Sequence, residues 1–286
     1  MDRDFFQKYY DSQVDEAKKY LSIVPKAATY VEINRFKGAV KNILIFIRLV
    51  KEMNPEFSPK KKVKKLQNLL KPAVKISNLQ RQQILTRAWM RDKNHEMNGY
   101  YNYLKHRELN SRLKFEKAAK RIKPSTLIML WTKISKRTKN MHLDYIKFKT
   151  EKRFENQINE LIDLNKDNNK SEKKISKLGI CAKEAQSLFE IIQLSNPTSR
   201  RLSKLEQSLR ELNHLLENCY DLNNGLYLLS DFIENCGNNT ATIKTLYSDY
   251  INYLTDQRKI LLDEFDSKWG TFIDLAKKER EWISIL

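Results

Sequence analysis

The sequence is poor in the two residues that most often interrupt regular structure. Among 286 residues there are six glycines and six prolines, which favours long elements with few breaks. Strict alternation of apolar and polar residues, the pattern of a half-buried strand, is also missing, and apolar residues recur at helical spacing. The sequence therefore predicts a protein that is nearly all α-helix.

Disulfide, export and membrane signals are absent as well. The three cysteines, Cys181, Cys219 and Cys236, are an odd number without a C-x-x-C motif, which indicates reduced thiols in a reducing compartment. The first eight residues include acidic side chains and no apolar core, unlike a secretory signal. No apolar run is longer than Ile43–Ile47, which is far shorter than the roughly 20 residues of a membrane-spanning helix. We expect a soluble, cytoplasmic protein without a membrane span.

Motifs for catalysis and for metal binding are also missing. The sequence has no glycine-rich phosphate loop, no serine nucleophile elbow and no paired-carboxylate signature. Its four histidines, at positions 95, 106, 142 and 214, fall on different expected elements, and none has a histidine or cysteine partner at metal-ligand spacing. We expect no enzyme, no catalytic residues, no metal site and no cofactor.

Basic residues are in large excess, and the excess lies in one part of the chain. The net charge is +19. Residues 1–30 are neutral overall, residues 31–150 carry 30 basic and 8 acidic groups (+22), and residues 151–286 carry 19 basic and 22 acidic groups (−3). A field of one sign over part of a molecule favours an anionic partner. Nucleic acid, a phosphate polymer and an anionic membrane all remain open.

Prolines and polar stretches divide the expected helices. Pro25 ends a first helix, Pro59 starts a later one, and Pro72 predicts a kink inside it. The polar stretch 164–172 marks a domain boundary. The expected helices cover 2–22, 29–53, 59–93, 100–122, 125–164, 174–193, 198–219, 225–235, 240–268 and 271–285. The expected domains are an N-terminal helix (1–28), a strongly basic bundle (29–164) and a near-neutral second bundle (172–286).

The helix expected over 29–53 has two distinct faces. Phe36, Val40, Ile43 and Ile47 recur at helical spacing and form an apolar face. Lys37, Lys41 and Arg48 share another face. The stripe of cations either lines a groove for a polyanion or belongs to a core helix with solvated lysines.

The next helix is also basic, at its start and along one side. Lys64, Lys71 and Lys75 share a polar face that continues through Asn78 and Gln82. The start is a cluster whose interpretation stays open between a solvated helix end and a nuclear-localisation or heparin-like patch. That cluster consists of Lys60, Lys61, Lys62, Lys64 and Lys65.

Two runs on these helices match a known pattern in part. Asn34–Lys37, followed by Lys41, Asn42 and Leu44, resembles the lead helix of the CHAD domain (conserved histidine α-helical domain), which reads His-x-Leu-Arg with basic residues four, five and seven positions later. Lys37 and Lys41 keep the charge, while Asn34 replaces the signature histidine. Val74–Gln80 resembles the Gly-Lys-Ile-Arg-Asp-Leu-Gln stretch of the family's second helix, without its arginine and aspartate.

A second copy of the pattern occurs later in the chain. Ser203–Glu206 and Arg210–Glu217 are similar to the opening of the family's second repeat, again without the histidine and the first arginine. The resemblance extends from Thr29 to the C-terminus and identifies the chain as a degenerate member. It implies two antiparallel four-helix bundles in tandem, related by pseudo-twofold symmetry around a basic channel, with an extra N-terminal helix.

The resemblance also implies binding of inorganic polyphosphate. This polymer has regular charges and no base edges, so cations on rigid helices suffice to bind it, and lysine serves as a point charge. The expected polyanion-binding residues are Lys37, Lys41, Arg48, Lys64, Lys71, Lys75, Arg121, Lys204 and Arg210.

Two other functions remain open. The basic half could bind RNA or DNA through the phosphate backbone, or the chain could be a helical scaffold for protein partners. Aromatic residues among the lysines could stack on bases, although packing in the core explains them as well. These aromatics are Tyr100, Tyr101, Tyr103, Trp131, Tyr145 and Phe148. The oligomeric state is not determined by the sequence.

Overall fold

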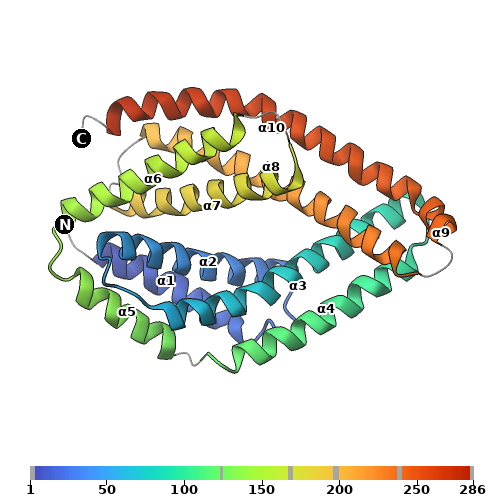
Figure 1. The fold of residues 1–286 in the computed structure, drawn as a ribbon, viewed down its shortest axis with the longest axis horizontal. Helices are drawn as coiled ribbons and strands as arrows, with labels where there is room; N and C mark the ends of the chain where they lie inside the picture. Colours follow the sequence, from blue (N-terminus) through green and yellow to red (C-terminus); the bar gives the residue numbers. More distant parts are fainter. Residues whose placement is uncertain (1–3, 123–124, 167–169, 196–199, 237–239, 284–286) are drawn as a thin grey trace. The chain divides into compact units, whose positions relative to one another are not determined.

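A computed structural model of the chain describes residues 4–122, 125–166, 170–195, 200–236 and 240–283. Every regular element within these residues is an α-helix (Figure 1), so the predicted all-α class is confirmed. The helices are α1 (Asp4–Leu21), α2 (Tyr30–Met53), α3 (Lys60–Lys93), α4 (Asn98–Ala119), α5 (Ser125–Thr138), α6 (Leu143–Asn165), α7 (Glu172–Ser195), α8 (Arg200–Glu234), α9 (Thr240–Leu246) and α10 (Ser248–Ile283).

Local sequence signals explain where the first helices begin and end. Thr29 and Glu32 form a capping box at the start of α2: the Thr29 amide donates to Glu32 Oε2 (2.8 Å) and the Glu32 amide donates to Thr29 Oγ1 (3.3 Å). Pro59 precedes α3, and its carbonyl accepts from the Val63 amide (3.0 Å). Asn94 ends α3 with a φ of 47°, a left-handed conformation that asparagine tolerates.

Three predicted boundaries are wrong. The helix expected over 125–164 is two helices, α5 and α6. The Thr138 hydroxyl donates to the Ile134 carbonyl (3.1 Å), and the Met141 amide turns back to the Thr138 carbonyl (3.0 Å). The hydroxyl thus competes for helical acceptors at the last turn of α5, although no glycine or proline marks the break.

The other two errors are breaks that the structure does not contain. Residues 200–219 and 225–234, which were expected in two separate helices, belong to one helix, α8, which continues through Gly225. Residues 240–268 and 271–285 were expected as two helices separated near Gly270, whereas α10 is continuous there and a separate short helix, α9, precedes it. A glycine inside a helix costs only about 1 kcal/mol relative to alanine, which packing readily offsets.

The chain folds into two compact units, each built from alternating stretches of sequence. Four helices contribute residues to both units: α3, α4, α6 and α7. The tandem bundles with pseudo-twofold symmetry and the domain limits stay predictions. The first unit comprises Met1–Gln80, Lys105–Phe154 and Ser187–Pro197, and the second comprises Arg81–Leu104, Glu155–Gln186 and Thr198–Leu286.

The core of the first unit is organised around α2. The predicted apolar face is confirmed, since Phe36, Val40, Ile43 and Ile47 are all buried. Phe46 extends the buried surface of α2 beyond this face, and its ring contacts aromatic rings of α1 and α5. Burial on several sides requires that neighbouring helices surround α2.

In the second unit, α8 packs against α10, and an aromatic cluster lies at one end of the pair. Tyr100 is fully buried against Phe232, Tyr247 and Tyr250. The hydroxyl groups of Tyr250 and Thr86 are 3.2 Å apart and share a hydrogen bond. Burial raises the pKa of Tyr250 to about 12, so its hydroxyl loses its proton only at strongly alkaline pH.

Gly225 is required by a close approach between α3 and α8. Gln82 of α3 is fully buried and donates to the Asp221 carbonyl of α8 (2.7 Å). A Cβ atom at position 225 would lie 3.2 Å from Cδ of Gln82 and still closer to its Oε1. Gly225→Ala should therefore lower the free energy of unfolding by about 1–3 kcal/mol, measured by chemical denaturation.

Gly270→Ala is the matched control, because a Cβ atom there meets no atom within 4 Å. It should stabilise the protein by up to about 1 kcal/mol through helix propensity. Equal effects of the two substitutions would show that the contact with Gln82 is unimportant.

Candidate functional site

The excess positive charge lies almost wholly in the first unit. Its residue ranges contain 33 basic and 13 acidic residues, a net charge of +20, whereas the second unit contains 21 basic and 22 acidic residues, a net charge of −1. Charge therefore follows the packing units, although four helices pass from one unit to the other. The electrostatic field of the first unit is therefore strongly positive.

Lys37 lies at the contact between α2 and α3. Its Nζ donates to the Ser77 hydroxyl of α3 (3.2 Å), and that hydroxyl donates to Asn34 Oδ1 of α2 (2.8 Å). Ser77 is buried, and Lys37 is half-buried. Lys41, one turn further along α2, is half-buried too. The contact with Ser77 holds the ammonium group of Lys37 against α3, while part of the side chain stays accessible.

The predicted lysine face of α3 lies elsewhere on that helix. Lys64, Lys71 and Lys75 are exposed. Ser77 follows Lys75 by two residues, which is roughly 200° around a helix of 3.6 residues per turn. Lys37 therefore reaches a side of α3 different from the one that carries the three lysines. Sequence spacing grouped residues within each helix and could not show which sides of two helices meet.

The remaining predicted residues are scattered. Arg48 is exposed on α2, and Arg121 is exposed just after α4. Lys204 and Arg210 lie on α8 in the second unit, where both are exposed. Arg210 forms an ion pair with Glu206 one turn away, which already compensates its charge.

Lys133 of α5 lies near the lysine cluster at the start of α3. Burial, together with the nearby charge of Lys133 on α5, lowers the pKa of Lys62. Arg137 of α5 pairs with Glu56 (2.8 Å), which holds α5 beside the segment that leads into α3. Lys133 is a cation that spacing along the sequence could not associate with this cluster, because it follows much later in the chain.

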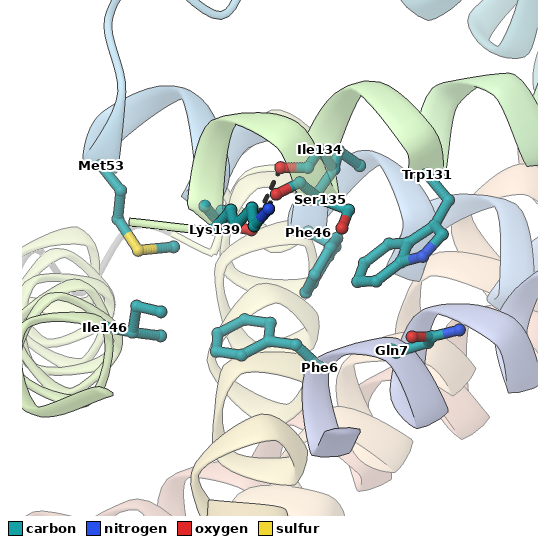
Figure 2. A pocket seen from close by; sticks show the side chains of 10 residues that line it. Phe6, Gln7, Phe46, Met53, Trp131, Ile134, Ser135, Lys139 and Ile146 are labelled. Carbon is teal, nitrogen blue, oxygen red and sulfur yellow. Dashed lines mark hydrogen bonds between the residues drawn. The ribbon is translucent and has the colours of Figure 1, made fainter. Parts of the chain in front are cut away.

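A pocket of about 140 Å³ opens in the first unit, among α1, α2, α5 and α6 (Figure 2). Its walls are mainly apolar, and Lys139 and Gln7 are among the few polar residues. Such a lining suits a small apolar group rather than a polyanion. Its apolar walls are formed by Phe6, Phe46, Met53, Trp131, Ile134 and Ile146.

Two negative findings concern the part of the chain that the structure describes. In those residues, no three histidine, cysteine, aspartate or glutamate side chains are grouped so that they could hold a metal ion. No helix there has an apolar stretch long enough to cross a membrane.

Comparison with known proteins identifies a similar fold. No family model and no curated protein matches the sequence. Among solved structures, the crystal structure of the CHAD domain from the plant Ricinus communis matches with a TM-score of 0.72 and 10% sequence identity, over 94% of this chain and 90% of that one. The chain thus has a CHAD-like fold, and the resemblance predicted from its helices is confirmed at the level of the fold.

The contact between Lys37 and Ser77 can be tested through stability. Ser77→Ala removes one acceptor from Lys37 and the donor to Asn34, so we expect the free energy of unfolding to fall by about 1–2 kcal/mol, measured by urea denaturation. Ser111→Ala is the control: Ser111 is equally buried but bonds only to the Arg107 carbonyl of its own helix (2.8 Å). An equal, small loss in both variants would contradict a special role for Ser77.

Proposed function

We propose that the protein is a non-catalytic binding module for inorganic polyphosphate or a similar polyanion. The observation that carries this proposal is the concentration of charge: on a CHAD-like fold, the first unit has a net charge of +20 and the second has −1. A cytoplasmic location is part of the proposal, and the free thiols of Cys181, Cys219 and Cys236 support it.

The proposed ligand contacts are the lysines of α2 and α3. Lys37 and Lys41 are one helical turn apart, as are Lys71 and Lys75, and such pairs are roughly 5–6 Å apart at Cβ. A flexible chain of phosphates can adapt to this spacing, because it needs neither directional base recognition nor a planar, two-pronged partner such as arginine. The helices fix the backbone positions of these lysines, so only their side chains become ordered on binding.

Each neutralised phosphate should contribute to the salt dependence of binding. By analogy with single-stranded nucleic acid, each contact adds roughly 0.7 to the slope of log affinity against log salt concentration. The pair Lys37 and Lys41 on α2 and the pair Lys71 and Lys75 on α3 should then each contribute roughly 1.4 to the slope.

The proposal can be tested with charge-reversal pairs. Lys37→Glu with Lys41→Glu, and Lys71→Glu with Lys75→Glu, should each weaken binding of long-chain polyphosphate at least about tenfold and reduce the salt slope by roughly 1.4. Affinity is measured by titration calorimetry at several salt concentrations, and folding by circular dichroism.

The matched control is Lys244→Glu with Lys259→Glu. Both lysines are exposed in the second unit, and the change in net charge is the same. An equal loss in the control would show that only overall charge matters, and unchanged binding in both test pairs would disprove the proposed contacts.

A further inference from the structure

The structure separates the aromatic residues of the basic half into two groups. Tyr100 and Tyr101 are buried, and Trp131 is half-buried and stacks on Tyr10. Tyr145 and Phe148 of α6, in contrast, are 40% and 55% exposed. Core packing explains the first group, whereas these two rings are open to solvent.

A ring and a lysine four residues later form a unit that occurs twice on α6. Lys149 Nζ lies 5.4 Å from the centre of the Tyr145 ring, and Lys152 Nζ lies 5.8 Å from the centre of the Phe148 ring. Residues three and four apart share one face of a helix. The four side chains therefore form one surface, which we call the α6 aromatic face.

This face points away from the packed side of α6. The helix is anchored through Ile146, Thr150 and Phe154, which are at most 3% exposed. Arg153 pairs with Glu52 of α2 (2.9 Å) and holds α6 to the core of the first unit. The exposed rings thus stand on a helix whose position is fixed by other residues.

The electrostatic surroundings favour an anion with planar groups. The face belongs to the first unit, with its net charge of +20. Three carboxylates lie along this part of α6: Asp144 is exposed, and Glu151 and Glu155 are half-buried. The first-unit part of α6 has four basic residues (Lys147, Lys149, Lys152 and Arg153) and two acidic ones (Asp144 and Glu151). Accessible rings beside ammonium groups offer stacking and phosphate neutralisation together, the combination that binds single strands without regard to sequence.

We propose that the α6 aromatic face binds single-stranded nucleic acid. Tyr145 and Phe148 stack on bases, and Lys149 and Lys152 neutralise the adjacent phosphates. This activity goes beyond polyphosphate binding, because polyphosphate has no bases and gains nothing from the rings.

The rings and the lysines can be tested separately. Tyr145→Ala with Phe148→Ala should weaken binding of a fluorescently labelled single-stranded oligonucleotide at least about tenfold, with an unchanged salt slope. Lys149→Gln with Lys152→Gln should instead reduce the salt slope by roughly 1.4. Both are measured by fluorescence anisotropy at several salt concentrations.

Three controls distinguish stacking from other causes. Tyr227→Ala removes a 60% exposed tyrosine from α8 of the second unit and should leave oligonucleotide binding unchanged. Tyr145→Leu with Phe148→Leu keeps apolar side chains but removes the rings, and should weaken binding as the alanine pair does. Replacing the two rings by alanine should leave the affinity for long-chain polyphosphate unchanged. This control holds whether that affinity is high or low, so it does not depend on the polyphosphate proposal.

Three results would overturn the proposal. The unaltered protein could fail to bind the oligonucleotide, or the alanine pair could bind it as well as the unaltered protein does. The third result combines two measurements: the leucine pair keeps full oligonucleotide affinity, and the alanine pair loses affinity for phosphatidylserine vesicles. The rings would then insert into an anionic membrane surface and would not stack on bases. Circular dichroism confirms that each variant is folded.

Discussion

The first unit depends on the burial of α2 from several directions. Ile33 and Phe36 are fully buried in its first half, and its polar residues are bonded to neighbouring helices. Asn42 donates to Gln13 of α1 (3.0 Å) and accepts from the Ser187 hydroxyl of α7 (2.9 Å). Polar groups enclosed in this way must be satisfied by protein partners, so these bonds fix the position of α2. The backbone positions of its lysines are fixed as a result.

Arginines and lysines have different tasks in this unit. The arginines hold structural elements together through ion pairs and hydrogen bonds. Arg112 is the clearest case, because its guanidinium also donates to the Val24 and Ala28 carbonyls (2.6 and 2.9 Å) between α1 and α2. Its rigid fork of donors suits such a contact, whereas lysine suits a solvated surface. The arginine–glutamate pairs are Arg112–Glu108, Arg137–Glu56 and Arg153–Glu52. Because these carboxylates are already paired with arginines, they are not free to neutralise the lysines. The remaining positive charges repel one another and oppose the compact state of the unit, and a bound polyanion would relieve that repulsion.

Prediction from the sequence succeeded where local chemistry decides the outcome. The proline before α3 predicted where that helix starts, and the spacing of Phe36, Val40, Ile43 and Ile47 identified a buried face. The helix expected from about Thr29 begins there, at a capping box that the structure reveals. It failed where tertiary packing overrides local preference. Two helices were expected over 198–219 and 225–235, but α8 is continuous through Gly225, where Gln82 of α3 packs closely against it.

The candidate sites divide in the same way. The sequence by itself determined that the protein is helical, that positive charge is concentrated between residues 31 and 150, and which lysines share a face of one helix, because these properties depend on composition and on the 3.6-residue period. Only the tertiary structure decided that Lys37 contacts Ser77, that Lys133 lies near Lys62, and that Tyr145 and Phe148 stay exposed while Tyr100 is buried. Those outcomes depend on which sides of distant helices pack together, and helical periodicity contains no information about that choice.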